Sequence, residues 1–120
     1  MQLIVDRIFA VSDQVRYVAL YRNGALTTHQ RDGVAGASQS ETDRYEELFV
    51  NPVLLTAARQ RGNVDCGGLR YIIVGYGNFN QLVMPLSSGH ISVCLESTAD
   101  LAVHVEAVTT AVAGCLADVP

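Results

Sequence analysis

Hydrophobic and polar residues alternate along several short runs of this chain, and the alternation predicts β-strands. The clearest region spans residues 68–96, where three apolar runs are separated by two short turns. We expect strands over residues 69–76, 79–86 and 90–96, joined at Gly77-Asn78 and at Ser87-Ser88-Gly89. Runs rich in Val, Ile, Tyr and Phe between such turns are typical of an antiparallel meander.

Residues 15–22 and 25–30 form a second predicted hairpin. Asn23 and Gly24 between them tolerate the positive φ that a type I′ turn requires. The centre of residues 15–22 is apolar at odd and even positions, which indicates a strand covered on both faces. The later half of residues 25–30 is polar and favours the edge of a sheet.

Apolar residues at helical spacing predict helices over residues 2–12, 42–61 and 99–116. In the middle one, Asn51-Pro52 is expected to cause a break, or to divide it into two short helices, because proline lacks an N–H and disfavours the α region for its predecessor. Gly62 is the predicted C-terminal stop. Before Asn51, the apolar stripe of the predicted helix consists of Tyr45, Leu48 and Phe49. After Pro52, the residues expected on the buried side are Val53, Leu54, Ala57 and Ala58.

The predicted order of elements is α-β-β-α-β-β-β-α, an α+β fold with a five-stranded antiparallel sheet flanked by helices. A length of 120 residues suits a single domain over residues 1–120.

Composition adds an expectation about partners. Hydrophobic residues make up 49% and charged residues 17%, against an average of about 25% charged. We therefore expect part of the apolar surface to be buried against another subunit. The basic residues are all Arg, the last is Arg70, and the net charge of −4 belongs to the part that follows. This argues against a nucleic-acid partner, which needs a basic face, and leaves either solubility or attraction of a basic partner.

Cys66, Cys94 and Cys115 are odd in number and form no C-x-x-C pair, which fits a reducing, cytoplasmic location. The N-terminal apolar run is too short for a signal peptide. No stretch reaches the roughly 18 apolar residues of a membrane span.

Candidate chemistry is sparse. His90 follows Ser87-Ser88-Gly89, but ordinary turn composition explains this better than a nucleophile. Cys66 lies in a glycine-rich loop, where a structural turn is favoured over a reactive thiol. His29, His90 and His104 share no ligand spacing, so we expect surface or capping histidines. We predict no enzyme activity, no cofactor and no metal.

The element order, Asn23-Gly24 in the first hairpin and a helix ending at Arg61-Gly62 resemble the roadblock/dynein light chain family. So does the hairpin formed by residues 82–86 and 89–93 before an Ala-rich last helix. The resemblance covers nearly the whole chain.

The resemblance implies a profilin-like fold and a non-enzymatic homodimeric scaffold or adaptor that binds or regulates a small Ras-like GTPase. In such dimers the middle helix and third strand of each subunit meet their counterparts. Carried over to this sequence, the dimer interface consists of Tyr45, Leu48, Phe49, Leu55, Arg59, Leu69, Tyr71 and Ile73. Asn51-Pro52 departs from the unbroken middle helix that is usual in the family.

The sequence itself supports one part of this interface. A long apolar strand over residues 69–76 at a sheet margin is expected to pair with a second copy across a two-fold axis. The alternative is a small-molecule-sensing domain of profilin-like shape, with a ligand between sheet and helix. It requires converging polar groups around a pocket, and the sequence shows no obvious set.

Overall fold

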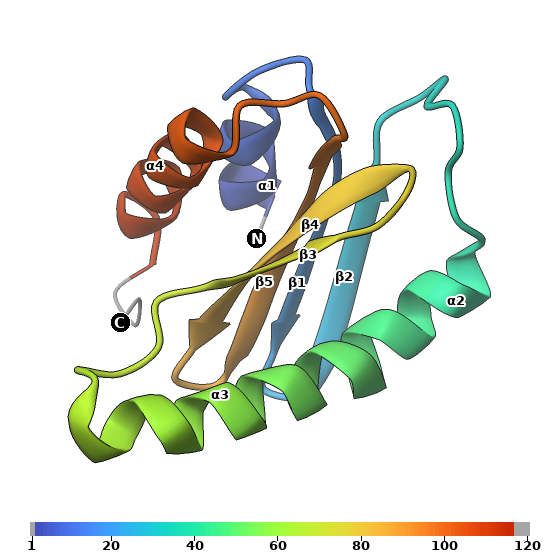
Figure 1. Ribbon diagram of the computed structural model, residues 1–120. Helices are drawn as coiled ribbons and strands as arrows, with labels where there is room; N and C mark the ends of the chain where they lie inside the picture. The colour runs from blue at the N-terminus through green and yellow to red at the C-terminus, as the bar shows by residue number, and fades with distance from the viewer. Residues whose placement is uncertain (1, 117–120) are drawn as a thin grey trace.

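A computed structural model describes residues 2–116 (Figure 1). The ends of the predicted domain, residue 1 and residues 117–120, lie outside the described residues. The strands are β1 (Val15–Arg22), β2 (Ala25–Gln30), β3 (Ile72–Gly75), β4 (Phe79–Leu86) and β5 (Gly89–Glu96). The helical elements are α1 (Gln2–Phe9), α2 (Ser40–Tyr45), the π-helical turn η1 (Glu46–Val50), α3 (Asn51–Asp65) and α4 (Leu101–Ala113). The predicted order and fold class are confirmed.

The five strands form one antiparallel sheet in the order β2-β1-β5-β4-β3. α1 and α4 pack together on one face, where they cover the main apolar core. The other face is crossed by α2, η1 and α3, which run as one long rod (Figure 1). Within residues 2–116, no helix is long and apolar enough to cross a bilayer.

The first hairpin forms as predicted, with the same bounds for both strands. Asn23 and Gly24 have φ values of 53° and 83°, as the predicted turn requires. β2 is an edge strand. At the same end of β1, Gly89 of β5 pairs with Arg22 so closely that a Cβ on Gly89 would lie 1.8 Å from the carbonyl oxygen of Tyr21. Only glycine fits at that position.

The predicted break at Asn51-Pro52 is wrong. Asn51 has helical angles, φ −64° and ψ −45°, and its N–H donates to the carbonyl of Glu46, five residues earlier. This wider π turn comes directly before Pro52, so the missing N–H of proline falls where the helix has already changed its hydrogen-bond spacing. The helix therefore continues.

The predicted stop at Gly62 is also wrong, because α3 extends to Asp65. The chain turns back through Gly67 and Gly68, whose φ values are 80° and 93°. Gly68 donates to the carbonyl of Gly62 at 3.1 Å, and a Cβ on Gly62 would lie 3.0 Å from Gly68. Glycine at position 62 favours this close approach, because a Cβ there would push the Gly68 backbone away by a few tenths of an ångström.

β3 lies at the sheet edge, as predicted, but it is shorter than the predicted run of residues 69–76. Ile72 pairs with Val83, so a longer ladder would place Arg70 opposite Pro85. Because proline has no N–H to donate, the ladder is not favoured beyond this point. The prediction of a long, bare apolar edge is therefore wrong in length.

Candidate protein-interaction surface

The rod formed by α2, η1 and α3 carries an apolar stripe on its outer side. Tyr45, Phe49 and Val53 follow one another at four-residue spacing, which places them in a row on one helix face. The exposed fractions of the stripe residues are 60% for Tyr45, 40% for Leu48, 55% for Phe49, 52% for Val53 and 37% for Leu54. The rings of Tyr45 and Phe49 stack with centroids 5.3 Å apart. This apolar stripe is open to solvent in the single chain.

The inner side of the same rod is polar. Glu47 and Asn51 face the sheet and are both completely buried, and Leu55 continues the same row. The usual arrangement of a helix on a sheet places apolar residues inward and polar residues outward. Here that arrangement is reversed over η1 and the first half of α3.

The Glu47 carboxylate accepts hydrogen bonds from four side chains on three strands and the rod. Tyr17 Oη and Gln81 Nε2 lie 3.1 and 3.3 Å from Oε2. Asn51 Nδ2 and His90 Nε2 lie 2.9 and 2.8 Å from Oε1. A buried carboxylate is stable only when such donors replace its hydration. The cluster therefore fixes the π turn, and the stripe above it, on the sheet.

The buried surroundings of the Glu47 carboxylate shift the pKa values of neighbouring side chains. Burial and then the charge of Glu47 raise the pKa of the Tyr17 hydroxyl, so Tyr17 keeps the proton that it donates. Burial also raises the pKa of the Cys94 thiol well above its usual value. Cys94 is therefore an inert packing residue.

Solved structures of other proteins share this architecture. A Roadblock/LC7 domain from Streptomyces avermitilis is 18% identical over 88% of this chain and 88% of that chain, with a TM-score of 0.63. The gliding protein MglB from Thermus thermophilus is 12% identical over 94% and 87% of the two chains, with a TM-score of 0.65. MglC from Myxococcus xanthus is 12% identical over 92% and 94%, with a TM-score of 0.56.

This chain has the Roadblock/LC7 fold. The resemblance inferred from the sequence is thus confirmed at the level of the fold. No protein-family model and no curated protein sequence matches the chain.

On the Roadblock/LC7 fold, the helical residues of the predicted interface divide into two groups. Tyr45, Leu48 and Phe49 belong to the exposed apolar stripe. Leu55 is only 4% exposed and packs inside the single chain, so it offers no surface to a partner. Arg59 is half-buried, and its Nη2 donates to the carbonyl of Leu86 at the end of β4.

The predicted interface residues near β3 are all half-buried in the single chain. Ile73 and Tyr71 pack against the core under α1 and α4, on the face opposite the rod. Leu69 precedes the strand. The structure therefore does not bring the eight predicted residues onto one surface.

The second half of the rod overturns a further prediction. Val53, Leu54 and Ala57 were expected on its buried side, but all three are exposed. A signal for this was present in the sequence, since Glu47, Asn51 and Leu55 repeat at four-residue spacing. This pattern was missed because the rule that apolar residues face inward took precedence over a row that begins with the polar residues Glu47 and Asn51.

The candidate chemical groups occupy structural positions. His90 and His104 are buried rather than on the surface. His104 forms hydrogen bonds with Ser12 Oγ at 2.8 Å and with the Asp100 carbonyl at 2.7 Å.

Cys66 is exposed, and its thiol donates to Asp65, whose pKa is lowered chiefly by the hydrogen bond from Arg61. Among residues 2–116, no three His, Cys, Asp or Glu side chains are grouped to hold a metal.

Proposed function

We propose that this chain is a non-enzymatic, homodimeric scaffold or adaptor in which the apolar stripe is covered by the stripe of a second copy. The observation that carries the proposal is the reversed rod. Its Glu47 is buried, while aromatic and aliphatic side chains on its outer side remain exposed. Exposed apolar patches of this kind mark protein contacts.

The proposed contact is isologous. Two rods related by a two-fold axis place each apolar stripe against the other, so one surface serves both copies. β3 lies at the sheet edge and is only four residues long. We propose that Tyr45, Leu48 and Phe49, with Val53 and Leu54, form the centre of the contact, and that the half-buried residues near β3 form its margin.

A small Ras-like GTPase is the proposed partner of this dimer. Two considerations support it. The sequence resembles a family whose members bind and regulate such GTPases, and a protein with the same fold, from Thermus thermophilus, is a gliding protein. A cytoplasmic location is also proposed, because Cys66, Cys94 and Cys115 are all free.

Light scattering coupled to size-exclusion chromatography tests the dimer. The wild-type chain should have twice the chain mass of 12.9 kDa, and Phe49→Asp should have the mass of one chain. Val103→Asp is the matched control, since Val103 on α4 is 61% exposed but lies on the opposite layer. A monomeric wild type, or a Phe49→Asp variant that keeps the dimer mass, would refute the proposal.

A pull-down tests the partner. The purified chain should retain a small Ras-like GTPase of its own organism, and it should prefer one of the GDP-loaded and GTP-analogue-loaded forms. Loss of retention by Phe49→Asp would show that the dimer is required, while retention by that variant would place the partner elsewhere on the chain. Failure to retain any such GTPase in either state would refute this part alone.

A further inference from the structure

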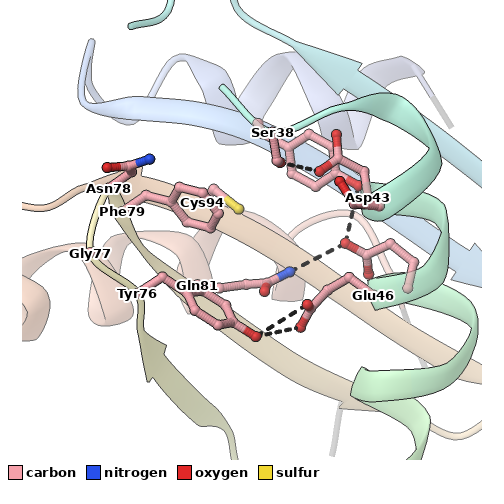
Figure 2. Close-up of a pocket in the computed structure, with 12 residues that line it drawn as sticks. Ser38, Asp43, Glu46, Tyr76, Gly77, Asn78, Phe79, Gln81 and Cys94 are labelled. Atoms are coloured by element: carbon pink, nitrogen blue, oxygen red, sulfur yellow. Dashed lines mark hydrogen bonds between the residues drawn. The ribbon is translucent and has the colours of Figure 1, made fainter. Parts of the chain in front are cut away.

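A cavity of about 320 Å³ opens between the start of the rod and the turn that joins β3 to β4. Figure 2 shows Tyr76, Gln81 and Glu46 converging on it from the turn, β4 and η1. It lies beside the buried Glu47 cluster and is separate from the apolar stripe. The volume is at the lower end of the range typical of small-ligand pockets.

The charged side chains among the described residues that line this cavity are acids. They are Asp43, Glu46 and Glu47, and no described basic residue lines it. Among the described residues, Glu47 is satisfied by its four donors, whereas Glu46 accepts from the hydroxyl of Tyr76 alone, shared between Oε1 and Oε2 at 3.1 and 3.0 Å. Asp43 accepts from Ser38. The cavity wall therefore has acceptor capacity on two carboxylates.

Gln81 adds an uncharged acceptor. It is 2% exposed, and its Oε1 atom is buried without a hydrogen-bond partner in residues 2–116. Its orientation is fixed, because Nε2 donates to the Glu47 carboxylate and lies 2.6 Å from Ser92 Oγ. A buried carbonyl without a donor is costly, and this one lies in the wall of the cavity, where a small side-chain movement would let it accept from a bound donor.

The carboxylate of Glu46 lies close to other acids. Burial raises its pKa, and the charges of Glu47 and Asp43 raise it further, while the Tyr76 hydrogen bond opposes them. A bound cation would relieve this repulsion.

We propose that this cavity binds a guanidinium group. Carboxylates accept the planar N–H fork of a guanidinium side by side, and Gln81 Oε1 offers a further acceptor. The rings of Tyr76 and Phe79, whose centroids lie 5.6 Å apart, provide aromatic walls. Phe79 shows that an aromatic ring here can contact a guanidinium, but the guanidinium carbon of Arg16 lies 5.4 Å from its centroid and occupies that ring face, which leaves Tyr76 as the free aromatic wall.

Guanidinium is favoured over the other cations. The three acids are not grouped for a metal ion among the described residues. A primary ammonium has three donors around one point and does not match the planar arrangement of carboxylate pairs. The guanidinium can belong to a free small molecule or to an arginine side chain of a polypeptide, and the test separates these sources.

The probes are agmatine, a glycine-serine peptide with one central arginine, and the same peptide with citrulline, a neutral isostere. Each is titrated into the full ¹⁵N-labelled chain while amide shifts are followed by NMR. The arginine peptide and agmatine should shift the amides of Gly77, Asn78 and Gln81 saturably. Tighter binding of agmatine would indicate a free ligand, and tighter binding of the peptide would indicate a polypeptide arginine.

Glu46→Gln keeps an acceptor for Tyr76 but removes the charge, and it should weaken binding about tenfold, as the loss of a charge-assisted hydrogen bond does. Asp43→Asn should weaken it in the same direction. Glu41→Gln is the matched control, because Glu41 is exposed on the same helix but does not line the cavity. Equal binding of the citrulline peptide, absence of saturable shifts, or unchanged binding by both cavity variants would overturn the proposal.

The groups that form this cavity all belong to one chain, so binding there does not depend on the proposed dimer. Such binding also bears on the sensing alternative. The converging polar groups that the sequence did not reveal come from α2, η1, β4 and the β3–β4 turn, which the fold brings together.

Discussion

Glu47 lies where a helix facing a sheet normally places an apolar side chain. Its interactions reach β1, β4 and β5, so one residue joins the rod to three strands. Because Glu47 is completely buried, its stability depends on these donors and on Asn51.

Glu47→Ala should therefore reduce the free energy of unfolding by about 3–5 kcal/mol, because it leaves several buried donors without an acceptor. Urea unfolding followed by circular dichroism measures this. Glu41→Ala, at an exposed position, should change it by no more than about 0.5 kcal/mol. Similar small effects of both substitutions would contradict the role given to the cluster.

Protonation of Glu46 provides a second prediction. Its pKa is raised, so it loses its charge at a higher pH than an ordinary glutamate. The groups facing it are Glu47 and Asp43 on the rod and the Tyr76 hydroxyl, whose own pKa is raised to about 12 by burial and by Glu46. Tyr76 therefore stays neutral, and binding of the arginine peptide should weaken as the pH falls through the pKa of Glu46.

The measurement is the NMR titration repeated at decreasing pH. Glu46→Gln should show a shallower dependence than the wild type, because one titrating group is removed. An equally steep dependence in both proteins would assign the effect to another group.

At the scale of elements, sequence patterns predicted the β1–β2 and β4–β5 hairpins well. Local chemistry dominates there, since Asn23-Gly24 specifies a turn and alternation specifies a face. The rod was predicted less well. The effect of Pro52 depends on whether the preceding turn is α or π, and the hydrogen bond that decides this, from Asn51 to Glu46, is not visible in propensities.

The candidate surface and cavity illustrate the same limit. Tyr45, Leu48 and Phe49 could be selected from their spacing, but which face of the rod is buried depends on polar residues of β1, β4 and β5. The cavity combines residues as distant in the sequence as Tyr17 and Cys94. Such long-range encounters follow from topology and not from local pattern.

β1 and β5 approach each other closely at Gly89. Gly89→Ala should lower the free energy of unfolding by about 1–3 kcal/mol, as overpacking does, because the new methyl group would overlap the Tyr21 carbonyl. Gly77→Ala is the matched control, since Gly77 has open space and no positive φ. Thermal or urea unfolding compares them, and equal stability of the two variants would contradict the packing described for Gly89.

At the scale of the whole molecule, the two sides of the sheet are built differently. The side under α1 and α4 is an apolar core, and the side under the rod contains the polar cluster. The apolar core on the first side stabilises the single chain without any partner. We expect the second side to gain stability when the apolar stripe is covered.

Heating tests this expectation without any partner. Because association favours the folded form by mass action, the midpoint temperature of wild-type unfolding should rise with protein concentration. Phe49→Asp should show a midpoint that does not change with concentration, and Val103→Asp should behave as the wild type. A wild-type midpoint independent of concentration would contradict association through the stripe.

The end of α3 has a practical consequence. Cys66 is exposed there, whereas Cys94 is buried and Cys115 is half-buried. In a Cys115→Ser background, a nitroxide spin label will attach at Cys66. Each copy then carries one unpaired electron at the tip of its rod, and the dipolar coupling between two copies gives the separation of those tips and hence the crossing geometry of the pair.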